Sequence, residues 1–259
     1  MKFKKVWGIF LFLLVTVGCS KDSGTSGDTS TKIDKSQNLL SLGDSAHDLL
    51  SDEKFTSISL EVVYVSGYQP SSTTLSNLKQ FLADHTYKPD GIHITTRAVV
   101  SSGKAPFNID EIAEIETRER LTFNAGDEIS VYIYFADGSN ENDTSTHVVL
   151  GSAYRNTSIV IYGKTINKIA ANYNAPDKTV IESTTLEHEF GHLFGLVNVG
   201  SPMQTPHEDP DNEAHCSVKG CLMNANIQFG GGLVDVIDNN EVIPFDDYCI
   251  ADLEANGGK

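Results

Sequence analysis

The sequence predicts an α/β (α+β) fold built on a twisted, mostly parallel five-stranded sheet. The first observation is the order of its elements: strand, helix, strand, helix, three strands and a long helix. The second is residues 128–138, EISVYIYFADG, whose nearly continuous apolar run is typical of a buried parallel strand. The third is residues 197–247, where Pro, Gly, Asn and Asp are frequent and periodicity is lost. We therefore expect an irregular C-terminal subdomain that ends in a helix, DDYCIADLEA, at 246–255.

Alternation and helical spacing identify the first elements in chain order. Residues 55–67, FTSISLEVVYVSG, alternate and are rich in Val, Ile and Tyr, which predicts a strand. Residues 71–86 begin with Ser and Thr and place Leu and Phe at helical spacing, which predicts a helix. Residues 91–101, GIHITTRAVVS, predict a second strand. Residues 108–121 place isoleucines three apart behind acidic first-turn residues, which predicts a second helix.

Two strands and the longest helix follow the buried strand. The segments THVVLGSAY (146–154) and TSIVIYG (157–163) predict the strands. The segment TVIESTTLEHEFGHLFGL (179–196) predicts the helix, with Thr179 and Glu182 as a capping-box pair. Its apolar positions predict that this helix is buried.

The first residues, MKFKKVWGIFLFLLVTVGCS, have the plan of a secretory signal. The apolar run is shorter than the roughly 20 residues that a membrane-spanning helix needs, and it fits the apolar region of a signal peptide. The Gly18-Cys19 pair that follows resembles the end of a bacterial lipoprotein signal, in which the cysteine is lipidated. We therefore expect 1–18 to be a lipoprotein signal peptide and Cys19 to be the lipid anchor. The protein would then be an exported cell-envelope lipoprotein, at the outer membrane or the cell surface.

Composition divides the remaining chain. Residues 19–53 are rich in Ser, Thr, Gly, Asp and Lys, so they predict a flexible tether, in which the leucine spacing of 38–50 could form a short helix. Residues 54–259 are long enough for one domain with a core, and we expect subdomains at 54–195 and 196–259. The net charge of −16 has the wrong sign for binding phosphate backbones, so no nucleic-acid partner is expected. We expect a monomer.

The segment HEFGH, residues 188–192, predicts a metal site. Positions i and i+4 share one face of a helix, so His188 and His192 can reach one ion. A catalytic zinc keeps three protein ligands and one water, whose pKa falls to about 7. Glu189 stands beside the two histidines and can take the proton of that water. The pattern predicts Zn²⁺ as the cofactor and Glu189 as the catalytic base.

The residues leave the third ligand open. Asn198 stands where a third histidine would be expected, and an amide is a poor zinc ligand. Two histidines further along, His207 and His215, are the candidates. His207 lies beside acidic residues that could orient its ring.

The residues that carry a family resemblance are His188, Glu189, His192 and Gly195. Together they resemble the metzincin clan of zinc endopeptidases. In archaemetzincin-like sequences a ligand histidine is followed directly by a cysteine and then by Cys-x-Met, and HCSVKGCLMN has the same order after an insertion. The resemblance implies His215 as the third ligand, with His207 as the alternative, and Met223 as the apolar floor called the Met-turn. The chain is also similar to Bacteroidetes lipoproteins described as membrane metalloproteases.

The same resemblance implies an antiparallel edge strand that borders the cleft and pairs with an extended substrate. The residues in that place are Val149, Leu150, Gly151, Ser152 and Ala153. Archaemetzincins also have a Cys-x-x-Cys pair that completes a second zinc site. Only Cys249 stands in that region, so no second site is expected. Cys216 and Cys221 could form a disulfide, or either could pair with Cys249.

These features predict a zinc-dependent endopeptidase that hydrolyses a peptide or protein substrate by a zinc-bound water activated by Glu189. The protein would be anchored to the membrane through its lipid. The alternative is a non-catalytic surface lipoprotein that binds a peptide or protein partner on the same scaffold. Glu189 distinguishes the two, because a structural zinc site has no use for a carboxylate beside an open position.

Overall fold

The computed structural model describes residues 34–228 and 240–259. The predicted signal peptide, the lipid anchor at Cys19 and tether residues 19–33 lie outside the described residues. Within the described part, no helix is long and apolar enough to cross a membrane.

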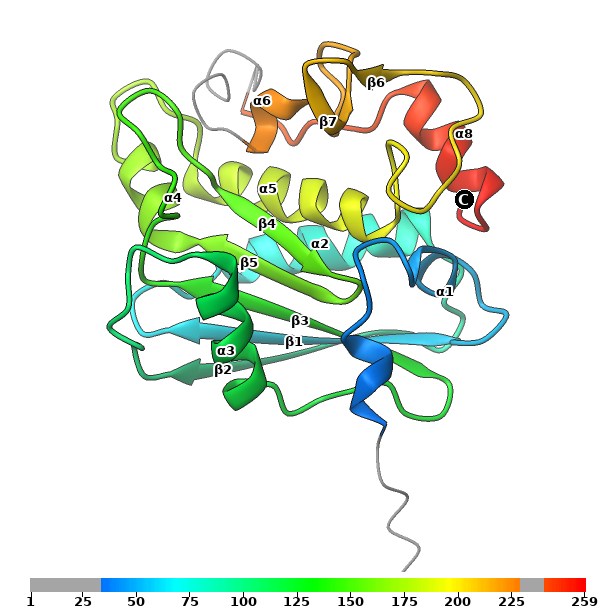
Figure 1. Cartoon of the computed structure of the whole chain (residues 1–259), viewed down its shortest axis with the longest axis horizontal. Coiled ribbons are helices and arrows are strands. Elements are labelled where there is room, and N and C mark those ends of the chain that lie inside the picture. The colour runs from blue at the N-terminus through cyan, green and yellow to red at the C-terminus, as the bar shows by residue number, and fades with distance from the viewer. Residues whose placement is uncertain (1–33, 229–239) are drawn as a thin grey trace, which may run out of the picture. The chain divides into compact units, whose positions relative to one another are not determined.

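A five-stranded sheet in the order β2-β1-β3-β5-β4 forms the centre of the folded unit, which confirms the predicted fold class (Figure 1). Neighbouring strands are parallel except at the edge, where β4 runs antiparallel to β5. The strands are β1 (Ser57–Val65), β2 (Gly91–Val99), β3 (Glu128–Ala136), β4 (Gly151–Arg155) and β5 (Ser158–Tyr162). Both faces of β3 are covered, which explains why its apolar residues are not separated by polar ones.

Helices cover the two faces of the sheet and make two cores. On one face, Ile112 and Ile115 of α3 (Ile109–Glu119) pack on β1, β3 and β5. On the other face, α2 (Ser72–His85), α4 (Gly163–Ala170) and α5 (Lys178–Leu193) bury the larger core. Ser71 caps α2, and a capping box at Asn108 and Glu111 starts α3. Every residue of α5 from Ile181 to Leu193 is buried.

The start of α5 differs from the prediction. The helix begins at Lys178 after Asp177, so Thr179 already lies inside it and no capping box forms with Glu182. The Glu182 carboxylate instead accepts a hydrogen bond from the Thr74 hydroxyl at 2.9 Å and pairs with Lys178 at 3.0 Å. Helix α4 was not expected, because no side chain caps its start and the eight-residue segment is short.

The predicted tether is corrected over residues 34–53, which are folded. A 3₁₀ helix, η1 (Lys35–Asn38), and α1 (Ala46–Leu50) lie in this segment. Leu49 and Leu50 are fully buried in the larger core, and the buried Asn38 amide donates to the Ser130 carbonyl at 3.0 Å. A few well-placed apolar and amide side chains therefore hold a segment whose overall composition is polar.

The C-terminal part lies across α5 from the sheet (Figure 1). It contains a hairpin, β6 (Glu208–Asp209) and β7 (Asn212–Cys216), then α6 (Ala225–Gln228) and the final helix α8 (Asp247–Ala255). The predicted terminal helix is confirmed. The short hairpin was not predicted, and it carries one of the candidate ligands.

Candidate metal centres

Helix α5 positions the first two histidines. His188 and His192 lie one turn apart and are buried, and their Nε2 atoms are 3.1 Å from each other. Two imidazole nitrogens on one tetrahedral zinc, each at 2.0–2.1 Å, would be about 3.3 Å apart. The helix alone therefore gives two ligand atoms the separation that one ion requires.

Gly195 ends α5 and turns the chain away from it. Its φ is +71°, a left-handed conformation that favours glycine. A Cβ at this position would lie 2.6 Å from the backbone nitrogen of Ser201, which folds back to donate to the Gly195 carbonyl at 2.8 Å. Asn198, three residues later, is exposed and is not part of the histidine group.

The hairpin brings the third histidine to the helix. One ring nitrogen each from His188, His192 and His215 lie within 4.8 Å of one another. His215 is on β7, and Glu208 on β6 accepts the N–H of Ala214 at 3.0 Å. The inserted segment therefore ends as a hairpin strand that points its histidine at the pair on α5.

Backbone carbonyls orient two of the rings. Nδ1 of His188 lies 2.6 Å from the Leu222 carbonyl oxygen, and Nδ1 of His215 lies 2.8 Å from that of Glu213. A carbonyl only accepts, so Nδ1 carries the proton and Nε2 is left as a metal ligand. Burial lowers the pKa of His188 to about 3 and that of His192 well below its usual range, so both rings are neutral. Three imidazoles with converging nitrogens fit a zinc ion.

Glu189 lies beside this group, on the side of α5 that faces β4. Its Oε2 accepts the backbone N–H of Ala153 at 2.7 Å, while Oε1 has no hydrogen-bond partner within the described residues. Burial raises the pKa of Glu189 to about 8. Gly151 makes room for the carboxyl group, because a Cβ there would lie 3.0 Å from Oε1.

Met223 lies against α5 at Gly191. A Cβ on Gly191 would be only 2.2 Å from the Met223 sulfur, so this helix position accommodates the methionine because it is glycine. Met223 is fully buried, and its predicted role as a floor beneath the metal stays a prediction.

The predicted edge strand is shifted by two residues. Val149 and Leu150 precede β4, and Gly151, Ser152 and Ala153 lie in it. The outward N–H of Ala153 is bonded to Glu189, so an added peptide strand would meet this donor already in use.

A second group of potential metal ligands lies in the C-terminal part, where no second metal site was expected. The structure brings Cys216, Cys221, Cys249 and Asp246 together, with one ligand atom from each within 4.8 Å of the others. The three thiols are free, and the sulfurs of Cys221 and Cys249 are 3.6 Å apart, against about 2.05 Å for a disulfide. Two thiolates on one zinc would be about 3.8 Å apart.

Asp246 was not identified from the sequence, because the expected pattern was a Cys-x-x-Cys pair and a carboxylate stands in place of one cysteine. It caps α8 through the N–H of Cys249, at 3.0 Å, and its Oδ1 lies 3.3 Å from the Cys221 sulfur. An acidic residue three positions before Cys249 was the available signal. Hydrogen bonds with the Cys221 and Cys249 thiols lower the pKa of Cys216, so the group forms its first thiolate there.

His207, the alternative third ligand, lies at this second group. Its Nε2 is 3.6 Å from the Cys249 sulfur and 3.7 Å from a carboxylate oxygen of Asp252. Its ring is buried and stacks on Tyr248 of α8. The structure therefore separates the two candidates: His215 joins the helical histidines, and His207 joins the cysteines.

Comparisons with solved structures find similar chains. Archaemetzincin from Methanopyrus kandleri is 16% identical with a TM-score of 0.48, over 78% of this chain and 96% of that one. A zinc-dependent peptidase from Methanocorpusculum labreanum is 16% identical with a TM-score of 0.48, over 75% and 99%. Metalloproteinase-II from Bacteroides fragilis is 14% identical with a TM-score of 0.40, over 79% and 54%. No family model and no curated protein sequence matches the chain.

Proposed function

We propose that this protein is a zinc-dependent endopeptidase whose centre consists of His188, His192, His215 and Glu189. The observation that carries the proposal is the position of Glu189. Its carboxyl group is buried, it follows one of the three converging histidines, His188, directly on α5, and one of its oxygens has no partner among the described residues. A purely structural zinc gains nothing from such a carboxylate, whereas hydrolysis needs a base at this place.

The chain supplies the base, the hydrogen bond that orients it and a strand edge that can pair with the substrate. A zinc ion bound by three histidines supplies a Lewis acid that polarises a carbonyl and acidifies water. The Ala153 N–H holds Oε2 of Glu189 and leaves Oε1 to take a proton from the attacking water and return it to the leaving nitrogen. The partly exposed edge of β4 can align an extended peptide beside the carboxylate.

The zinc-loaded protein is therefore expected to cleave casein or a mixed fluorogenic peptide library. Removing the metal with 1,10-phenanthroline should lower the rate by about 100-fold or more, and added zinc should restore it. The measurement is product fluorescence, with the zinc content of each sample determined in parallel. A protein that carries zinc but cleaves none of these substrates would support the alternative function, a binding lipoprotein on the same scaffold.

We also propose that the second group holds a structural zinc. Its members come from β7, from the segment before Met223 and from α8, so one ion would join three separate parts of the C-terminal subdomain. All three sulfurs are buried, and the carboxylate that meets them, Asp246, is held by the N–H of Cys249 at 3.0 Å. Asp246 or His207 would be the fourth ligand.

The two centres are expected to lose zinc separately. The wild-type protein should hold two zinc ions, and Cys221→Ser and His188→Ala should each hold one. Cys221→Ser should also melt at least about 5 °C lower, because a structural metal contributes to folding free energy. Metal analysis and thermal unfolding of the two variants test this. A wild-type protein with one zinc, or a Cys221→Ser protein that keeps two, would contradict it.

A further inference from the structure

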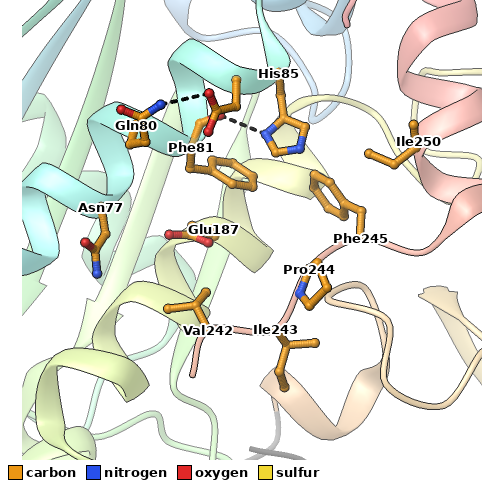
Figure 2. A pocket seen from close by; sticks show the side chains of 11 residues that line it. Asn77, Gln80, Phe81, His85, Glu187, Val242, Ile243, Pro244, Phe245 and Ile250 are labelled. Atoms are coloured by element: carbon orange, nitrogen blue, oxygen red, sulfur yellow. Dashed lines mark hydrogen bonds between the residues drawn. The ribbon is translucent and has the colours of Figure 1, made fainter. Parts of the chain in front are cut away.

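A pocket of about 410 Å³ opens on the side of α5 that faces α2 (Figure 2). Its walls come from α2, from Glu187 of α5 and from the segment Val242–Phe245 that precedes α8. Phe81, Ile243 and Phe245 give it an apolar lining, and the ring centroids of Phe81 and Phe245 are 5.5 Å apart.

The pocket is separate from the histidine centre. Two residues along a helix differ in direction by roughly 200°, so Glu187 and Glu189 point to opposite sides of α5. Glu189 contacts Ala153 of β4, whereas Glu187 lines the pocket with Asn77 of α2. One turn before Glu187, the Ser183 hydroxyl accepts the Asn77 amide at 3.1 Å, which shows that this face of α5 meets α2.

Glu187 gives the pocket its chemistry. The residue is 6% exposed, and its carboxyl group has no hydrogen-bond or ion-pair partner among the described residues. Burying an unpaired carboxylate is costly, and a ligand that pairs with it recovers that cost. The carboxyl group is labelled in Figure 2, where it lies among the side chains that line the pocket.

Asp84 and His85 are the other ionisable residues that line the pocket. Asp84 lies at the rim and adds a second negative charge, although the Gln80 amide already donates to it at 2.8 Å. Nδ1 of His85 lies 2.8 Å from the Phe81 carbonyl oxygen and therefore donates to it. An anion would be repelled by Asp84 and could not pair with the carboxyl group of Glu187, and a neutral apolar molecule would leave that group unpaired.

We propose that this pocket binds an organic cation, an amidinium, guanidinium or ammonium group on an apolar body. The charged head pairs with Glu187, and the apolar body packs on Phe81, Phe245 and Ile243. The aromatic rings add cation–π attraction, and the net charge of −16 favours the approach of cations. The proposal does not depend on peptidase activity.

Benzamidine is a suitable probe, because benzamide has the same shape without the charge. Isothermal titration at pH 7.5 with the zinc-loaded full chain should show benzamidine binding and at least tenfold weaker benzamide binding. Glu187→Gln should weaken benzamidine at least tenfold and leave benzamide unchanged. Glu254→Gln removes one charge at an exposed position of α8 and should bind both probes as the wild type does.

Unchanged benzamidine affinity in Glu187→Gln, equal affinities for the two probes in the wild type, or no benzamidine binding to the wild type would overturn the proposal. Zinc content and the unfolding curve establish that each variant is folded. Val242→Trp places a large side chain in the pocket from a partly exposed position and keeps the carboxyl group of Glu187. This variant should abolish binding of both probes. If Glu187→Gln does not fold, unchanged binding to Val242→Trp would overturn the proposal.

Discussion

Glu189→Gln is expected to remove nearly all peptide hydrolysis while both zinc ions stay bound. The amide keeps the shape of the carboxylate, and its oxygen can still accept the Ala153 N–H that now bonds Oε2 at 2.7 Å. It cannot take a proton from water. The loss of a positioned base lowers rates by about 10²–10⁴-fold, and the ligand atoms of the three histidines are untouched. The measurement is kcat/KM on a fluorogenic peptide together with zinc content.

The matched control is Glu254→Gln, which makes the same chemical change at an exposed position. It should cleave as the wild type does. If Glu189→Gln keeps a rate within tenfold of the wild type, another group activates the water and the assignment of the base is wrong. If it loses zinc as well as activity, Glu189 supports the ligands and the loss of rate does not identify a base.

The strands of the sheet were predictable because the residue pattern of each one lies within a short stretch of sequence. Residues 128–138 are apolar almost throughout, and they form a strand that is covered on both faces. Helix α4 was not predictable in the same way. Tyr162 gives it no side-chain cap, and its helical form depends on packing of Ile166 and its neighbours against the core. The segment that contains Leu49 and Leu50 was assigned to the tether although its leucine spacing indicates a short helix, because the contacts that hold it are with residues far along the chain.

Residues of the histidine centre that lie close together in the sequence were easier to predict than those that the fold brings in from a distance. The spacing of His188, Glu189 and His192 in the sequence is enough to predict that one helix brings them together. His215 could be proposed only from its place before Cys216 and Met223, because a hairpin of the inserted segment brings it to the helix. Asp246 is the least local. Its position before the last helix is typical of a helix cap, and it does cap α8. Only the fold shows that the same carboxylate also lies beside three thiols.

His215→Ala and His207→Ala are expected to remove zinc from different centres. His215 has a ring nitrogen within 4.8 Å of those of His188 and His192, and Glu213 orients it. Its loss leaves two protein ligands where a catalytic zinc needs three. We expect affinity at this centre to fall by more than about 100-fold, since even the removal of a residue that orients a ligand costs 10–100-fold. Hydrolysis should fall with it.

His207→Ala is the matched control, because it makes the same change in the same inserted segment. Its Nε2 lies at the Cys249 sulfur, so the variant should keep the histidine-bound zinc and its hydrolytic activity. Any loss of metal should come from the cysteine group. Zinc content, a competition titration with a chelator and the cleavage rate of both variants separate these outcomes. If His207→Ala abolishes hydrolysis and His215→Ala does not, the third ligand of the catalytic zinc is His207. The order of residues before Met223 is then not a guide to that ligand.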